Sequence, residues 1–152
     1  MIFTNDMFAC PCCGENKVVD EVVKRLNKAL LFLHESFWGG AIVRITSGYR
    51  CPKHNKDVGG SKHSLHIQGL AVDSIPILPA SATDIAKGHA LRYWTFSLIR
   101  AGFNGIGQTL PDKEGQIAIH ADLRQLIGKP PQIWALSDNL KEYGKYMYYF
   151  RW

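Results

Sequence analysis

Hydrophobic residues recur at helical spacing in the first half of the chain. In residues 18–37 the apolar side chains fall three or four positions apart, which is the spacing of one helix face, and Gly39 and Gly40 end the pattern. Residues 82–101 predict a second helix, which Gly102 closes. The sequence therefore predicts two long helices, one in each half of the chain.

Four short runs are typical of strands, being apolar, β-branched or bounded by turn residues. They are residues 41–46, 70–75, 103–107 and 116–123. Pro76 is expected to end the second run, and a turn at Pro111 and Asp112 separates the last two. The order helix, strand, strand, helix, strands predicts an α+β fold, with a small, mainly antiparallel sheet and flanking helices.

The chain has the length of one domain. Its 152 residues contain no internal repeat or linker, so we expect a single domain over residues 1–152, acting as a monomer. Residues 143–152 are strongly aromatic and are expected to pack on the domain as a final strand. No apolar run approaches the roughly 18 residues of a membrane span, and the N-terminus does not resemble a secretory signal. We therefore expect synthesis in the cytoplasm and no membrane-spanning segment.

The charge balance is mildly basic. Lys and Arg number 18 against 13 Asp and Glu, a formal net charge of +5, which favours anionic partners such as nucleic acid, anionic lipid or an acidic cell-wall polymer. Like charges never form a block of five, so the chain lacks a recognisable nucleic-acid arm and we expect no nucleic-acid partner.

Candidate chemistry centres on two histidines and one aspartate. His66 precedes Asp73 by seven residues, and His120 follows far downstream. Two imidazoles and one carboxylate are the ligand set of many catalytic zinc sites, which keep a fourth position for water. Gly69 lets the backbone turn tightly between the first two residues. In a strand, Asp122 would share the face of His120.

The same ligand set also occurs in non-haem iron oxygenases. Those enzymes commonly place a His-x-Asp pair first and the second histidine later. Here the pair His120-x-Asp122 comes last and no histidine follows it, so the order disfavours an oxygenase.

Four cysteines, Cys10, Cys12, Cys13 and Cys51, leave three interpretations open. Cys10 and Cys13 form one C-x2-C pair, with Cys51 as a distant third metal ligand, but the paired knuckles of a typical zinc site are absent. A disulfide from the cluster to Cys51, or free thiols packed in an apolar corner, would equally fit the sequence.

Several motifs together resemble the M15 family of zinc peptidases, especially its D-alanyl-D-alanine carboxypeptidase-like and phage endolysin-like members. The matching residues are Phe8, Cys10, Cys13-Gly14, Ile45-Thr46-Ser47-Gly48-Tyr49-Arg50-Cys51-Pro52, His54-Asn55, Val58-Gly59-Gly60, Ser64, His66, Gly69, Ala71, Asp73, His120, Asp122 and Arg124. The resemblance covers about residues 8–124, and residues 125–152 match no family pattern.

This resemblance implies a hedgehog/DD-peptidase-like fold and zinc bound by His66, Asp73 and His120. It implies that Arg50 stabilises the developing oxyanion or holds a substrate carboxylate, and that Ser64 lines the substrate pocket. The implied substrate is a peptidoglycan stem peptide, cut at a bond involving D-amino acids, by a D-Ala-D-Ala carboxypeptidase or an L-Ala-D-Glu-type endopeptidase. By the same analogy the protein is phage- or prophage-encoded and is delivered to the cell wall.

The sequence departs from this family at the general base. Many members carry an acidic residue or a histidine two or three positions before the last zinc histidine, where this chain has Ile117 and Ala118. Asp122 is the candidate base, and its alternative role is to orient a ligand or to pair with Arg124. Weaker candidates are Asp112, Glu114 and His63. The missing upstream base keeps a second function open, a zinc-containing module that binds cell wall without catalysis.

Overall fold

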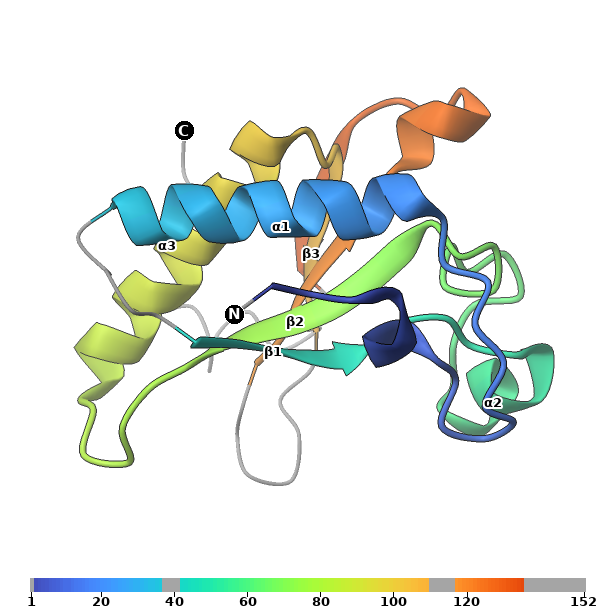
Figure 1. Ribbon diagram of the computed structural model, residues 1–152, viewed down its shortest axis with the longest axis horizontal. Coiled ribbons are helices and arrows are strands. Elements are labelled where there is room, and N and C mark those ends of the chain that lie inside the picture. Colours follow the sequence, from blue (N-terminus) through green and yellow to red (C-terminus); the bar gives the residue numbers. More distant parts are fainter. Residues whose placement is uncertain (1, 37–41, 110–116, 136–152) are drawn as a thin grey trace.

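The computed structural model describes residues 2–36, 42–109 and 117–135 (Figure 1). The helices are η1 (Asn5–Phe8), α1 (Asp20–Glu35), α2 (Pro52–Asp57), α3 (Asp84–Ala101) and η2 (Arg124–Ile127), where η marks a short 3-10 helix. The strands are β1 (Ile42–Ser47), β2 (Ala71–Ile77), β3 (Gly105–Gln108), β4 (Ile119–Asp122) and β5 (Gln132–Ala135).

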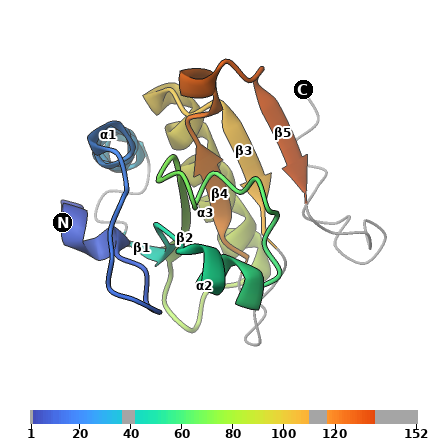
Figure 2. The ribbon, with the colours of Figure 1, turned by 90° about the vertical axis from the view of Figure 1, so that its right-hand side faces the viewer.

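The five strands form one sheet in the order β1-β2-β4-β3-β5 (Figure 2). The first three pairings are antiparallel, and β5 pairs in parallel with β3. The expected α+β class, a mostly antiparallel sheet with flanking helices, is confirmed.

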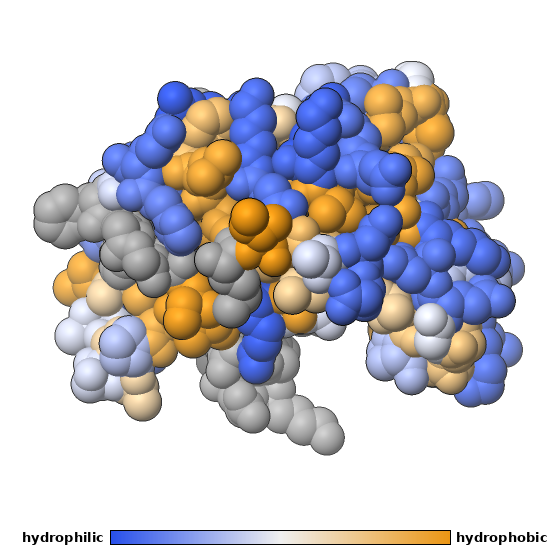
Figure 3. Space-filling view, viewed as in Figure 1, coloured by the Kyte–Doolittle hydropathy of each residue, from blue (hydrophilic) through white to orange (hydrophobic). Residues whose placement is uncertain are grey.

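The hydrophobic core lies between the sheet and the two long helices, which also contact each other. Val22 and Leu26 of α1, with Trp94 and Leu98 of α3, are fully buried in it. The outer side of α1 is polar at many positions (Figure 3), because a helix that buries only one stripe leaves the other side to water. None of the helices within the described ranges is both long enough and apolar enough to cross a membrane.

Strand alternation separates the core from the site. Val72 on β2 and Ile119 on β4 point into the core. Their neighbours Asp73 and His120 therefore point to the opposite face of the sheet, where they line a cleft. One face of the sheet thus anchors the helices and the other face carries the polar residues.

Both long helices match the predicted segments. α3 begins after Thr83, whose hydroxyl accepts a hydrogen bond from the Ala86 amide at 3.2 Å. It ends at Gly102, which adopts the left-handed conformation with φ 99° and thereby stops the helix as expected.

The prediction that Pro76 ends the second strand is wrong, because β2 continues to Ile77 and Pro76 pairs with Val43 of β1. On its other side, β2 pairs with β4 only from Ala71 to Ser74. Proline is tolerated where one side of a strand makes no ladder, because its missing N–H then breaks no hydrogen bond.

Besides the two short 3-10 helices η1 and η2, two elements were not expected from the sequence. The region between Cys51 and Gly60, which the sequence suggests is a loop, contains α2, where Pro52 occupies the first turn and the Cys51 sulfur accepts from the His54 amide. β5 lies in the segment that matched no family pattern. The predicted turn at Pro111 and Asp112 and the aromatic residues 143–152 lie outside the described residues.

Candidate metal centre

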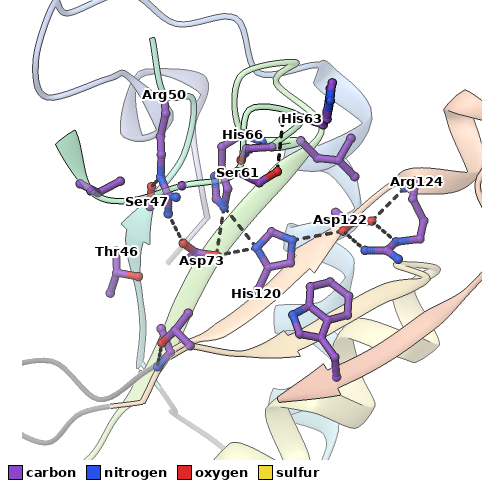
Figure 4. Close-up of a pocket in the computed structure, with 18 of the residues that line it drawn as sticks. Thr46, Ser47, Arg50, Ser61, His63, His66, Asp73, His120, Asp122 and Arg124 are labelled. Atoms are coloured by element: carbon purple, nitrogen blue, oxygen red, sulfur yellow. Dashed lines mark hydrogen bonds and ion pairs between the residues drawn. The ribbon is translucent and has the colours of Figure 1, made fainter. Parts of the chain in front are cut away.

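The structure brings together the three residues that the sequence singles out as metal ligands (Figure 4). His66 comes from the turn before β2, and Asp73 on β2 faces His120 on β4 in the antiparallel register. Asp73 Oδ1 lies 3.1 Å from His66 Nε2 and 2.8 Å from His120 Nδ1, and the two ring nitrogens are 3.2 Å apart. One oxygen and two nitrogens therefore converge on one point.

Gly69 makes the turn that brings His66 next to β2. It has φ 69°, and a Cβ at this position would lie 1.8 Å from the Lys17 carbonyl oxygen. Its amide donates to the His66 carbonyl at 3.2 Å, which closes the turn. A residue with a side chain would meet both a strained backbone and a direct clash, as the sequence suggests.

His66 is held in one tautomer by the backbone. Its Nδ1 lies 2.7 Å from the carbonyl oxygen of Gly48, which can only accept, so Nδ1 carries the hydrogen and Nε2 presents its lone pair to Asp73. The side chain is almost completely buried, and burial lowers its pKa. The imidazole is therefore neutral at pH 7, as a metal ligand must be.

His120 is held from its other side by Asp122. Its Nε2 lies 3.1 Å from Asp122 Oδ2, so that nitrogen donates and Nδ1 faces Asp73. Burial lowers the pKa of His120, but the hydrogen bonds to Asp122 and Asp73 outweigh it and raise the pKa to about 9. Without a metal, the ring holds a proton that a cation at this place would displace.

The donor set fits a divalent metal. Burial raises the pKa of Asp73, but its close contacts with His66 and His120 hold the pKa well below its usual range, so the carboxylate is ionised. Neighbouring ligand atoms of a tetrahedral zinc site lie about 3.3 Å apart, given bonds of about 2.0–2.1 Å. The observed spacings of 2.8, 3.1 and 3.2 Å would need only a small expansion.

Asp122 is saturated by hydrogen bonds. Its Oδ1 accepts from the Arg124 amide and Nε at 3.0 and 2.9 Å, and its Oδ2 accepts from Arg124 Nη2 at 2.8 Å as well as from His120. Only 1% of the residue is exposed. Burial raises its pKa, but these donors lower it to about 2. The contacts support the orienting role that the sequence leaves open beside that of general base.

Gly105 makes room for this pair. It lies opposite Asp122 in the sheet register, and a Cβ there would be 2.1 Å from Asp122 Oδ1 and 2.3 Å from Arg124 Nε. The carboxylate and guanidinium can lie over β3 only because the side chain is absent.

Trp134 of β5 is a site residue that the sequence analysis missed. Its ring lies 5.3 Å from the His120 ring and 4.6 Å from the Arg124 guanidinium carbon. The cation–π contact helps to hold that guanidinium in place. Trp134 lies in the segment that matched no family pattern, so no motif linked this ring to the site.

Arg50 contacts the metal ligands directly. Its Nη2 is hydrogen-bonded to Asp73 Oδ2, its Nε donates to Ser47 Oγ at 2.6 Å, and its amide donates to the His66 carbonyl at 3.2 Å. The guanidinium is therefore fixed beside the triad. Among the described residues, its Nη1 has no hydrogen-bond partner.

These residues line one open cleft of about 1170 Å³. Ser64 lines it, although its hydroxyl also accepts from the His66 amide at 3.3 Å. His54 and His63 also line the cleft, outside the triad. The weaker base candidates Asp112 and Glu114 lie outside the described residues.

Comparison with known proteins identifies a peptidase family whose model covers much of this site. No curated protein matches the chain. The family model for peptidase M15 matches residues 2–101, about two thirds of the chain, a range that contains Arg50, His66 and Asp73 and ends before His120. The sheet supplies His120 beside them, so the matched segment and the downstream strand complete one site. The chain therefore belongs to the peptidase M15 family.

Proposed function

We propose that the protein is a zinc-dependent peptidase that hydrolyses peptidoglycan stem peptides at a bond involving D-amino acids. The convergence of His66, Asp73 and His120 in an open cleft supports this proposal most directly. When bound by these three residues, zinc would supply Lewis-acid chemistry, polarising the scissile carbonyl and acidifying a water molecule.

Arg50 has two tasks in this proposal. Its bonds to Asp73 and Ser47 fix the plane of the guanidinium, and Nη1 is left to donate toward the cleft. A fixed cation at this position would stabilise charge that develops on the substrate oxygen, or would hold the terminal carboxylate of a stem peptide.

Asp122 is a positioning residue in this proposal. It holds the Nε2 hydrogen of His120, which leaves Nδ1 for the metal, and Arg124 holds the carboxylate in turn. The proton of the attacking water would then be taken by another group. Among the described residues, His54 and His63 are the imidazoles that line the cleft outside the triad, and we assign the task to one of them.

The cleft suits an anionic peptide. Arg50, Arg124 and Lys129 line it, in a chain whose formal net charge is +5. Stem peptides carry free carboxylates, so electrostatic attraction would favour their approach. Ser64 lines the cleft and would contact the bound peptide. We further propose that the protein acts as a monomer and reaches the cell wall by phage- or prophage-linked delivery.

Mass spectrometry of purified peptidoglycan fragments, incubated with the protein and zinc, tests this function. We expect loss of a terminal D-alanine or cleavage within the stem, and neither product from a His66→Ala, Asp73→Ala double variant. Intact fragments with the fully zinc-loaded protein would contradict the peptidase proposal.

One alternative has its own support. Ile117 and Ala118 occupy the positions where many M15 members carry the base, and the oxygens of Asp122 are engaged. A zinc-containing module that binds the wall without cleaving it would sediment together with insoluble peptidoglycan. It would release no soluble fragment.

A further inference from the structure

A second cluster of metal-ligating side chains lies away from the cleft. Cys10 and Cys13 belong to the turn after η1, and Cys51 precedes α2. Their three sulfur atoms all lie within 4.8 Å of one another. These cysteines belong to the described residues, and none of them lines the cleft that holds His66.

Backbone amides point at the sulfurs of this cluster. The Cys51 amide donates to Cys10 Sγ at 3.4 Å, and the His54 amide donates to Cys51 Sγ at 3.4 Å. Such N–H donors stabilise a thiolate, which is the form that binds metals.

A cation would balance the charge of the cluster. Three thiolates whose sulfur atoms lie within 4.8 Å of one another would repel each other. A metal held by all three removes this repulsion.

A disulfide would involve only two of the three neighbouring sulfur atoms. It joins two sulfurs at about 2.05 Å and leaves the third without a partner. Cys10, Cys13 and Cys51 are all free thiols in the structure, and only 1% of Cys10 is exposed. In a tetrahedral zinc–thiolate site, neighbouring sulfurs lie about 3.8 Å apart, given Zn–S bonds of about 2.3 Å. This spacing falls within the 4.8 Å that bounds the separations of the three sulfur atoms.

We propose that Cys10, Cys13 and Cys51 bind a second zinc ion as thiolates, releasing their thiol protons. Cys12 is not a member of the close triad, and its thiol lies 3.9 Å from Lys53 Nζ. The fourth position of the ion is then taken by solvent. The sequence leaves a metal site, a disulfide and free thiols open for this cluster. The closeness of all three sulfur atoms supports the metal site.

This ion would tie the N-terminal segment to a loop of the active site. The Tyr49 amide already donates to the Phe8 carbonyl at 2.8 Å. Gly48, whose carbonyl orients His66, and Arg50 flank that tyrosine. Cysteine ligands on both segments would fix this loop, so loss of the second ion should loosen the first site without removing any of its ligands.

Cys12 and Cys13 offer a matched pair of test variants, because both are exposed and adjacent, so neither replacement disturbs the core. The protein is purified under reducing conditions and analysed for zinc content. We expect two zinc ions per chain in the wild type and in Cys12→Ser, and one in Cys13→Ser. The His66→Ala, Asp73→Ala double variant should retain the cysteine-bound ion.

Substitution with cobalt identifies the ligands independently of activity. Thiolate-bound Co²⁺ gives an intense sulfur-to-metal charge-transfer absorption that a site of histidine and aspartate cannot give. We expect this band in the wild type, in Cys12→Ser and in the double variant, and its loss in Cys13→Ser. Absence of the band from the reduced wild type would overturn the proposal. A band lost equally in Cys12→Ser would overturn the assignment of the three ligands.

Discussion

Replacing Asp122 by asparagine separates the two roles that this residue could have. The carboxylate accepts at both oxygens, from Arg124 at three nitrogens and from His120 Nε2. An amide of the same shape puts an NH2 group where one oxygen was. In either orientation this group meets donors instead of acceptors, and each unpaired buried donor costs about 1–3 kcal/mol.

The consequence for His120 depends on its tautomer. If the new NH2 group faces Nε2, that nitrogen becomes the acceptor and the proton moves to Nδ1, which then has no lone pair for the metal. Loss of a residue that orients a metal ligand typically costs 10–100-fold in metal affinity, or about 1.4–2.7 kcal/mol. We therefore expect Asp122→Asn to bind zinc about 10–100-fold more weakly.

Competition with a chromophoric chelator measures this affinity, and turnover is then assayed at saturating zinc. In the orienting role, saturating zinc should restore most of the turnover. The reasoning is refuted if the variant binds zinc as tightly as the wild type but turns over about 10²–10⁴-fold more slowly at every zinc concentration. That result would make Asp122 the general base.

Three further outcomes follow from the site. Arg50→Ala should lower kcat/KM about 10²–10³-fold at saturating zinc, with partial recovery in Arg50→Lys because an ammonium lacks the planar fork; an unchanged kcat/KM in the alanine variant would exclude Arg50 from the mechanism. Because the metal-free pKa of His120 is raised to about 9, zinc binding at pH 7 should release about one proton from this ring, and the His120 contribution to affinity should rise with pH and level off above about pH 9. Calorimetry in buffers of different ionisation enthalpy counts that proton, and no release would contradict the hydrogen-bond assignment. Gly105→Ala, whose Cβ would lie 2.1 Å from Asp122 Oδ1, should weaken zinc binding and lower the Tm; wild-type values for both would show that the carboxylate tolerates displacement.

The local pattern of the sequence was sufficient for the main elements, and it singled out His66, Asp73 and His120, which the fold brings together. Periodicity of 3.6 located α1, since a helix that packs on a core repeats its apolar residues over several turns, and Gly102 marked the end of α3. Alternation placed His120 and Asp122 on one face of a strand, and the spacing around Gly69 joined His66 to Asp73. These features are local, so the sequence states them directly.

Two short elements were not recognised from the sequence. α2 has six residues, fewer than two helical turns, and β5 has four residues in the segment that matched no family pattern. Pro76 was expected to end a strand, but whether a missing N–H matters depends on which side of the strand is paired, and pairing is a property of the sheet.

The support of the site was decided by tertiary structure alone. The backbone carbonyl of Gly48 fixes the tautomer of His66. Every residue has such a carbonyl, so the sequence does not show which one contacts the ring. Trp134 reaches His120 only because β5 adds to the sheet beside β3. Sequence spacing could not show that Cys51 lies beside Cys10, because the contact spans 41 positions and depends on how η1 docks against the loop after β1. The sequence determines which residue types are available as ligands. Long-range packing determines the protonation and orientation of those side chains, because their hydrogen-bond partners come from segments that are distant in the sequence.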